Sequence, residues 1–274
     1  MKSWNQTEIR RAFTQQASGF ESNRMNFSQK EYLDYAVSKI APAKTDNVLE
    51  VAAGTCACGR AIAPYAGSVT CLDMTPAMLS VGRTEAEKER LCNIEFVVGD
   101  AAELPFADNR FDIVLSRLAF HHFPDAEMPF SEMRRVLRPG GKLVLIDMEA
   151  AEDSLRETED KIERLRAPSH VRNLSRAEML ELYRKHDLSV SCCETVKMPM
   201  ILQNWLDHTA TPVSVQKEIK ALMDEELAGG RKTGFAPYTE GTTVRFDHRW
   251  VLTIGKNKAV PGISKESAPV TRWE

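Results

Sequence analysis

The residues of this sequence that can do chemistry begin with an acid and small residues at the end of an apolar run. Residues 47–51 form the run, Glu50 lies inside it, and Ala52 and Gly54 follow before a helical pattern starts. This order is typical of a buried parallel strand that turns tightly into a helix. Ligands bind at such turns in open α/β sheets, and small side chains let them approach the backbone. We therefore predict a ligand site at the end of this strand.

A second acid, Asp73, ends the next short apolar run, residues 69–72. In Rossmann-like sheets, an acid roughly 20 residues after the first loop accepts hydrogen bonds from ribose hydroxyls. Taken alone, Asp73 would fit equally well as a helix cap or a solvated turn residue, because Thr75 and Pro76 open a helix directly after it. Beside the first loop, ribose binding is the better interpretation. The first loop lacks the GxGxxG and P-loop lysine patterns, which argues against a nicotinamide or nucleoside triphosphate ligand.

Two adjacent histidines, His121 and His122, follow the fourth apolar run. An imidazole titrates near neutral pH, so either ring is a candidate general base; the alternative is that one of them packs or caps the next helix. His170 and Arg172 lie two residues apart in a later loop and are candidates for substrate contact, since Arg binds carboxylates and phosphates. His170 is also a candidate catalytic residue. The alternative for this pair is a loop held by surface charges.

Three ring-bearing side chains late in the chain are candidates for the wall of an acceptor pocket. They are Trp205, His208 and Trp250. Aromatic side chains are more often part of the core, so this interpretation competes with simple packing.

A parallel sheet is needed to bring these residues together. Strands alternate with helices between residues 47 and 148, which predicts βαβ units with right-handed crossovers. The strands are expected at residues 47–51, 69–72, 94–98, 111–115 and 142–147, with the last two at 188–196 and 244–254.

The remaining segments are expected to cover this core. Residues 1–46 read as an N-terminal helical cap, either packed on the sheet or, between Phe20 and Phe27, lying over a bound ligand. The core is expected over residues 47–256. Long insertions are usually functional, so lid insertions are expected at about 149–175 and 198–243, and a loose tail at 257–274.

Composition excludes several classes of protein. The 274 residues carry a net charge of −3, which argues against a nucleic-acid binder with a basic face. No apolar run is long enough to span a membrane, and the N-terminus has no signal-peptide core, so a cytoplasmic protein is expected. The six cysteines lack the spacing of a disulfide scaffold or a zinc site, so we expect no metal.

Four sequence blocks follow one another between residues 47 and 148. They are VLEVAAGT, LDMTPAML, GDAAELPF, and FDIVLSRLAFHHFPD followed by VLRPGGKLVLID. Together they resemble the class I S-adenosylmethionine-dependent methyltransferases, within the group that includes the ubiquinone and menaquinone C-methyltransferases. This resemblance implies a Rossmann-like three-layer α/β sandwich with helical lid insertions, whose sheet would have seven strands, mostly parallel, with an antiparallel last strand. The cofactor would be S-adenosyl-L-methionine.

The resemblance also implies roles for the residues around the methionine and ribose parts of the cofactor. Glu50 and Gly54, with Ala52 beside them, would shape the pocket for the methionine part. Asp73 would bind the ribose hydroxyls. Arg117 would lie near the sulfonium end.

For the adenine, the resemblance implies that Met74 packs on the ring, with Met78 close by, and that Asp100 and Ala101 recognise its edge. One position departs from the family pattern. The third small residue of the first loop, usually Gly, is Cys56, whose side chain could narrow the pocket or alter the turn.

The function expected from these observations is methyl transfer to a small-molecule acceptor by in-line displacement. Such a transfer needs an aligned nucleophile and exclusion of water. The alternatives are a non-catalytic or repurposed S-adenosylmethionine-binding protein, motivated by Cys56, and a thiol- or metalloid-directed methyltransferase that uses the cysteines. The sequence does not fix the oligomeric state and leaves a homodimer open.

Overall fold

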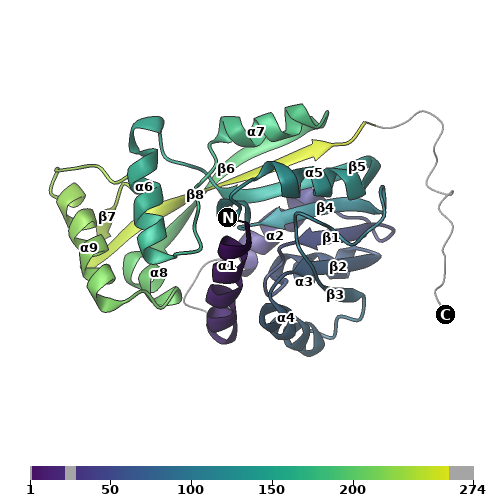
Figure 1. Ribbon diagram of the computed structural model, residues 1–274, viewed down its shortest axis with the longest axis horizontal. Coiled ribbons are helices and arrows are strands. Elements are labelled where there is room, and N and C mark those ends of the chain that lie inside the picture. The colour runs from purple at the N-terminus through teal and green to yellow at the C-terminus, as the bar shows by residue number, and fades with distance from the viewer. Residues whose placement is uncertain (1, 22–28, 259–274) are drawn as a thin grey trace.

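The predicted sheet forms the centre of the computed structural model, which describes residues 2–21 and 29–258 (Figure 1). The strand order is β3-β2-β1-β4-β5-β8-β6, with β7 paired to β8. The pairings among β1 to β5 are parallel, whereas β8 runs antiparallel to both β5 and β6. The strands are β1 Asn47–Val51, β2 Ser68–Asp73, β3 Ile94–Val98, β4 Phe111–Arg117, β5 Leu137–Met148, β6 Ser189–Ile201, β7 Tyr238–Glu240 and β8 Thr243–Lys256.

This arrangement confirms the predicted sheet of seven strands with an antiparallel last strand. The three-residue strand β7 adds a short hairpin to the far end of β8 and was not predicted. β5 starts at Leu137, earlier than the expected residue 142, because Leu137 already pairs with Phe111 before a register shift. The sheet is therefore that of a Rossmann-like fold whose strand order reverses between β1 and β4.

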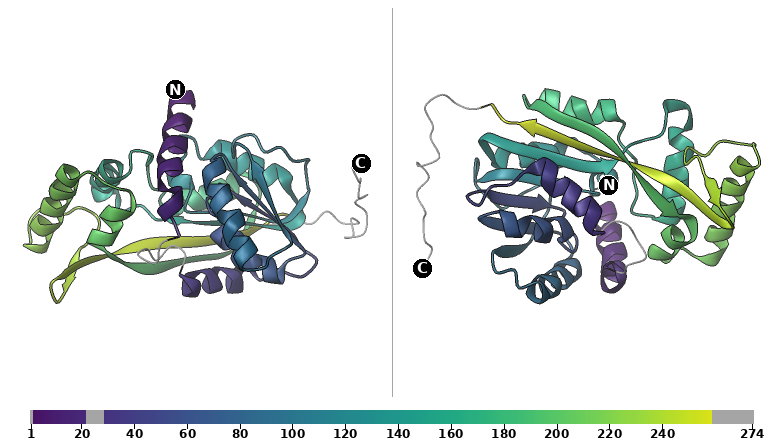
Figure 2. Two further views of the ribbon diagram at one scale, coloured as in Figure 1. Left: turned by 90° about the horizontal axis from the view of Figure 1, so that it is seen from below. Right: turned by 180° about the vertical axis from the view of Figure 1, so that it is seen from behind.

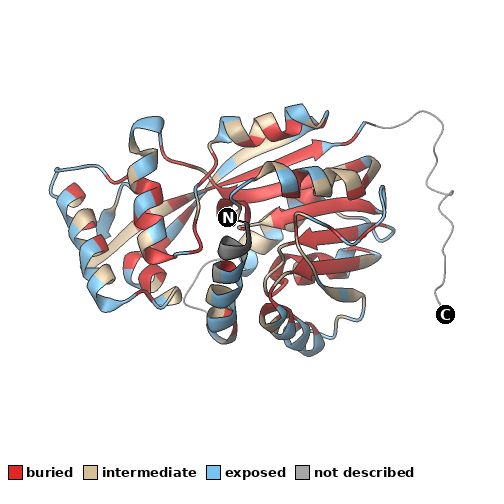
Figure 3. Cartoon of the chain, in the orientation of Figure 1, coloured by how far each residue is buried: buried red, intermediate tan, exposed pale blue. Residues whose placement is uncertain are grey.

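Helices cover both faces of the sheet, as the alternation of buried side chains requires. Along β1, Val48 contributes to one hydrophobic cluster with α2 and α3, whereas Leu49 contributes to the other with α5 and α7. Because both faces are covered, the central strands are almost entirely buried (Figure 3). The helices are α1 Lys2–Gln16, α2 Lys30–Ile40, α3 Ala57–Ile62, α4 Pro76–Lys88, α5 Glu127–Val136, α6 Asp153–Arg166, α7 Arg176–Lys185, α8 Leu202–His208 and α9 Val213–Leu227.

The long strands β6 and β8 continue beyond the core and carry a second group of elements, α6, α8, α9 and β7 (Figure 1). The core of this group contains Trp205, Phe235 and Phe246, whose rings pack edge to face. The segments expected as lid insertions, 149–175 and 198–243, supply its helices. None of the helices in residues 2–21 and 29–258 has the length and apolar character required to span a bilayer.

The two N-terminal helices lie on opposite sides of the sheet (Figure 2). α2 packs on the rear face beside α3. α1 stands on the front face, between the core and the second group of elements. The tail expected from residue 257 is attached at its start, since the Asn257 side chain donates hydrogen bonds to the carbonyls of Leu137 and Arg138. Residues 22–28 and 259–274, which include Phe27 and most of the tail, lie outside the described part of the chain.

Candidate active site

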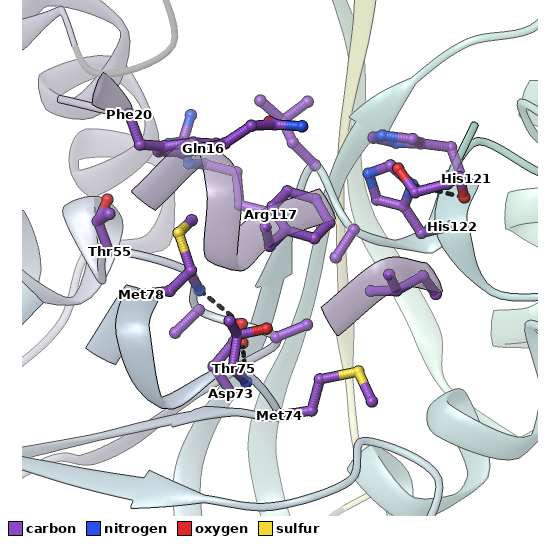
Figure 4. Close-up of a pocket in the computed structure, with 18 of the residues that line it drawn as sticks. Gln16, Phe20, Thr55, Asp73, Met74, Thr75, Met78, Arg117, His121 and His122 are labelled. Carbon is purple, nitrogen blue, oxygen red and sulfur yellow. Dashed lines mark hydrogen bonds between the residues drawn. The ribbon is translucent and has the colours of Figure 1, made fainter. Parts of the chain in front are cut away.

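A large cavity opens where β1, β2 and β4 end, with about 1270 Å³ of empty space including its mouth. One side of it, the strand-end half, comes from the loops after β1, β2 and β3 together with Arg117. The other side, the histidine half, comes from α1, η4 (Phe120–His122), the end of α6 and the loop after it, α8 and β8. Figure 4 shows Asp73 and Thr55 on one side of this space and His121 and His122 on the other. The size is that of a site for a ligand larger than a single amino acid.

The loop after β1 turns through three residues in the left-handed backbone conformation. Ala52, Gly54 and Cys56 have φ angles of 53°, 56° and 61°. The turn is closed by a 2.8 Å hydrogen bond from the Cys56 N–H to the Ala53 carbonyl. Ala52 and Gly54 line the cavity, whereas Cys56 is fully buried and does not. Its sulfur lies beside Gly82 of α4, so the side chain neither narrows the pocket nor prevents the turn.

Asp73 ties this loop to the next one. Its Oδ2 accepts a 2.8 Å hydrogen bond from the Gly54 N–H, and its Oδ1 accepts one of the same length from the Thr75 N–H. Burial raises the pKa of Asp73, and these two backbone donors partly oppose the shift. The carboxylate is therefore fixed in orientation at the end of β2 and lines the cavity.

Glu50 is the most buried acid of the strand-end half, with 2% of its surface exposed. Its Oε2 accepts a 2.7 Å hydrogen bond from the Gly59 N–H, in the first turns of α3. Burial raises its pKa to about 7, while Arg117 and the Gly59 N–H pull in the opposite direction. A positively charged ligand group beside it would favour its ionised form.

The other predicted cofactor residues line the same half of the cavity. Met74 and Met78 come from the loop after β2 and from α4, and Asp100 and Ala101 come from the loop after β3. Asp100 caps its own loop by accepting a 2.9 Å hydrogen bond from the Ala102 N–H.

In the histidine half, His121 is held by a carboxylate that our sequence reasoning missed. Its Nδ1 lies 2.6 Å from Oδ1 of Asp147 on β5. His122 lies beside it, with 4.1 Å between the ring centroids, and its Nδ1 lies 3.0 Å from the carbonyl of Ser169. Phe13 of α1 contacts His122 edge to face at 5.1 Å. Both predicted histidines are therefore cavity residues, with α1 packed against them.

Burial lowers the pKa of three histidines in this half. It lowers the pKa of His122 well below the usual value, with His121 nearby adding to the shift. Burial and then Arg166 lower the pKa of His208 to about 4. The pKa of His248 on β8 is also lowered by burial, although Glu163 opposes this. The rings of His122, His208 and His248 are therefore uncharged near neutral pH.

Four predicted substrate or catalytic residues occupy different environments. His208 lines the cavity and packs against Phe20 of the N-terminal segment. His170, Arg172 and Trp205 do not line it: the His170 side chain is enclosed and its Nε2 lies 2.9 Å from Asp160 Oδ1. Arg172 is directed to the surface, where it pairs with Glu178.

Trp205 is fully buried beneath the Arg166 guanidinium. Trp250 lines a smaller neighbouring pocket and contacts Arg117. The geometry gives no support to a substrate role for His170, Arg172 or Trp205.

Sequence reasoning missed Asp147, Arg166 and His248. Asp147 carries a signal that could have been used, because it ends an apolar strand as Asp73 does. Arg166 belongs to the charged helix α6 and His248 to the late strand β8. Only the packing of these elements in the folded chain brings the two side chains to the cavity.

Comparisons with known proteins identify the family and the fold of this chain. Residues 49–145 match the methyltransferase domain family. The uncharacterized methyltransferase YcgJ of Bacillus subtilis is 30% identical over 208 residues, which cover 76% of this chain and 82% of that protein. The crystal structure of YcgJ superposes with a TM-score of 0.77 at 27% identity, covering 85% of this chain and 100% of that one.

Two further relatives match shorter stretches. The uncharacterized protein YafE of Escherichia coli is 34% identical over 175 residues, covering 64% of this chain and 84% of that protein. A demethylmenaquinone methyltransferase of Listeria welshimeri is 43% identical over 108 residues, covering 38% of this chain and 45% of that protein.

The chain belongs to the class I S-adenosylmethionine-dependent methyltransferases. It is an enzyme of that class, and S-adenosylmethionine is its cofactor. The groups of the strand-end half fit this cofactor in their chemistry, since the lining offers carboxylates that accept hydrogen bonds, two methionine side chains and a small-residue loop. At Gly54, a Cβ would meet the Met78 side chain at 3.3 Å, so the bare backbone keeps this part of the cavity open.

Proposed function

We propose that the chain transfers the methyl group of S-adenosylmethionine to a small-molecule acceptor bound in the histidine half. The observation that carries this proposal is that both halves line one cavity. When bound, the cofactor supplies an electrophilic methyl group on a positively charged sulfur. The protein contributes by aligning an acceptor for in-line displacement and excluding water, which can lower the barrier by about 7–11 kcal/mol at best.

We assign the cofactor contacts as follows. Asp73 accepts hydrogen bonds from the ribose hydroxyls, because its carboxylate is already fixed by two backbone donors. Glu50 and the backbone at Ala52 and Gly54 hold the methionine part, and Arg117 lies near the sulfonium end.

The adenine would lie among the remaining residues of the strand-end half. Met74 and Met78 offer apolar, adaptable surfaces that pack well on a flat ring. Asp100 and Ala101 supply polar groups at its edge.

The acceptor is proposed to be largely apolar and not cationic. Phe13, Phe123 and Met148 line the histidine half together with neutral histidines, and its described lining residues include no carboxylate. An ammonium group would have no counter-charge there, and burying it unpaired would be costly. We propose that α1 and the segments 149–175 and 198–243 act as the lid over this half.

The alternative functions gain no support from the described residues. All six cysteines lie in residues 29–258, and none of them lines the cavity, which removes the motive for thiol-directed chemistry. Cys56, the reason to consider a repurposed protein, is turned away from the site.

The test has two stages. Calorimetric titration with S-adenosylmethionine and S-adenosylhomocysteine should show micromolar binding by the wild type and much weaker binding by Asp73→Ala. The protein is then incubated with the cofactor and a deproteinised small-molecule extract, and S-adenosylhomocysteine is quantified by mass spectrometry. Product above the Asp73→Ala background supports the proposal. Tight binding without product would favour a cofactor-binding protein without turnover.

Demethylated quinones should be screened as single compounds, given the name of the Listeria relative. The matched 108 residues make up 38% of this chain and 45% of that protein. They therefore do not carry over the acceptor of that relative.

A further inference from the structure

We propose that His121 is the general base that removes a proton from the acceptor, and that Asp147 positions it. This inference rests on the proposed methyl transfer to a small molecule. It selects one of three candidate histidines and adds a carboxylate. It also limits the acceptor to molecules whose methylated atom carries a removable hydrogen.

The Asp147 carboxylate is held by four hydrogen bonds. Oδ1 lies 2.6 Å from His121 Nδ1 and accepts a 2.7 Å hydrogen bond from the Met148 N–H. Oδ2 accepts hydrogen bonds from the N–H groups of Ala119 and Phe120, at 3.1 and 2.6 Å. Two of these donors belong to the segment that leads into His121, so the carboxylate fixes both the ring and the backbone that carries it.

This contact determines which ring nitrogen carries the proton. A carboxylate accepts, so His121 Nδ1 is the N–H and donates to Asp147, which leaves Nε2 with the lone pair. When the ring takes up a second proton, the adjacent carboxylate stabilises the imidazolium. The ring lines the cavity, so proton uptake can occur beside a bound acceptor.

The two other histidines have different surroundings. His122 Nδ1 lies 3.0 Å from the Ser169 carbonyl, and burial lowers its pKa well below the usual value, so this ring is suited to form a neutral wall. His170 has a carboxylate partner, Asp160, but its side chain is enclosed and does not reach the cavity. The His170 ring stacks on the His121 ring, with 5.6 Å between the ring centroids, and so helps to hold it in place.

The charged and titratable groups around His121 come from several elements. Asp147 faces it from β5, His122 from η4 and His170 from the loop after α6. Arg166 at the end of α6 and His248 on β8 line the same half of the cavity. Asp147 is the group that forms a direct hydrogen bond with the ring, so its removal should have the largest influence on proton uptake.

The proton and electron balance sets the acceptor class. The acceptor X–H gives its proton to His121 Nε2 while its electron pair forms the bond to the methyl carbon. The electron pair of the broken carbon–sulfur bond stays on sulfur, which becomes a neutral thioether. His121 then returns its proton to water. Hydroxyl, enol or heteroaromatic N–H acceptors satisfy this balance, whereas a thioether or a tertiary amine has no proton to give.

The first measurement is made on the complete chain with bound S-adenosylhomocysteine, using ¹⁵N-labelled histidine and NMR. We expect His121 as the Nδ1–H tautomer, with its signal assigned by its loss in His121→Gln. In Asp147→Asn the side-chain amide can donate to Nδ1, so the ring proton should move to Nε2. An Nε2–H tautomer of His121 in the wild type would overturn the proposal.

The second measurement is the rate of S-adenosylhomocysteine formation with the small-molecule extract, compared at saturating cofactor. His121→Gln should lower the rate by about 10²–10⁴-fold, the usual contribution of a general base, with cofactor affinity unchanged within about threefold. Asp147→Asn should lower it by at least tenfold and shift the acid limb of the pH–rate profile. His186→Gln is the matched control, since it removes a 2.6 Å contact between a histidine and a carboxylate, Glu127, that do not line the cavity. It should change neither the rate nor the pH–rate profile.

The outcomes separate the two proposals. If His121→Gln keeps the wild-type rate while Asp73→Ala loses it, the base assignment is wrong and methyl transfer stands. A loss of rate in His170→Gln together with a wild-type rate in His121→Gln would also overturn the assignment of the base to His121. If the wild type forms no product above the Asp73→Ala background, the proposed function itself fails. Melting temperatures within a few degrees of the wild type show that Asp147→Asn remains folded.

Discussion

The two halves of the cavity are built in different ways. The strand-end half uses residues 50–117, and its key carboxylates are held by backbone N–H groups in the same or the neighbouring loop. The histidine half draws on segments from Ile9 to His248, and its side chains are held by contacts between distant elements. With the roles proposed above, cofactor recognition is local, whereas acceptor recognition depends on how the outer elements fold.

Burial acts on the ionisable groups of both halves in the same sense, because it favours the uncharged form of each group. It raises the pKa of Glu50 and Asp73 in the strand-end half. In the histidine half, it lowers the pKa of His122, His208 and His248. The halves differ in the type of group: a cation bound beside Glu50 would favour its ionised carboxylate, whereas the three histidines offer neutral rings.

The sharpest separation of the halves is expected from Asp73→Ala. Loss of the carboxylate removes the proposed ribose contacts and leaves the Gly54 and Thr75 N–H groups without their partner. Hydrogen bonds to charged groups contribute about 1.5–3 kcal/mol each, so cofactor affinity should fall by about 100-fold or more. Calorimetry measures this. Asp73→Asn, which keeps one acceptor, should lose less, and wild-type affinity in Asp73→Ala would show that the ribose lies elsewhere.

Glu50→Gln tests whether burial disfavours the ionised form of Glu50, and the quantity measured is the free energy of unfolding. The folded pKa of about 7 lies above the ordinary 4.5, so between these values the native state binds more protons than the unfolded state. The wild type, without cofactor, should therefore lose stability as the pH rises from about 4.5 to 7. Glu50→Gln should be more stable than wild type at pH 8, on the order of 2 kcal/mol, with the difference disappearing near pH 4. Denaturant unfolding of both proteins at pH 8 and pH 4 measures this difference in unfolding free energy. An equal difference at the two pH values would contradict the raised pKa of Glu50.

Phe13→Ala tests whether α1 serves the histidine half alone. Phe13 lines the cavity and contacts His122, so its removal opens the acceptor side. The rate at low acceptor concentration should fall about tenfold, since burial of an aromatic ring contributes roughly 1.5–3 kcal/mol, while cofactor affinity stays within twofold. Phe13→Leu should recover most of the rate. A large loss of cofactor affinity would mean that the two halves are coupled through α1.

His208 should give the opposite pH dependence to Glu50. Its folded pKa of about 4 lies below the ordinary 6.5, so the unfolded state binds more protons between these values. The wild type should lose stability from this residue as the pH falls from about 6.5 to 4. His208→Gln should therefore lose on the order of 1 kcal/mol less than wild type on acidification. The quantity to measure is the change in unfolding free energy between pH 7 and pH 4.5 for each protein; equal changes would contradict this prediction.

The same contrast explains what could be predicted from the sequence. Glu50 lies within a short apolar run, and Gly54 and Asp73 come at or just after the ends of such runs. The distance from strand to loop is so short that chain order places the three residues at one edge of the sheet. His170 was expected to face a substrate, but α6 offers it Asp160 and the ring turns inward. The direction of the His170 side chain depends on how α6 packs, and the packing partners of α6 are far away in sequence. The local sequence pattern around His170 therefore cannot predict it.

The smallest effect is expected from Cys56→Gly, although family resemblance singled out this position. Glycine would relieve a left-handed conformation that costs roughly 1 kcal/mol with a side chain, and it would lose the packing of a buried thiol, which is worth a similar amount. Cofactor affinity should therefore stay within about threefold of wild type, as measured by calorimetry.

The matched change on the cavity side of the same loop is Gly54→Ala. Its new Cβ would lie 3.3 Å from the Met78 side chain at a φ of +56°, and affinity should fall about tenfold. If Cys56→Gly changed affinity more than Gly54→Ala, the thiol would influence the strand-end half in spite of its burial against α4. The separation of the two faces of this loop would then be wrong.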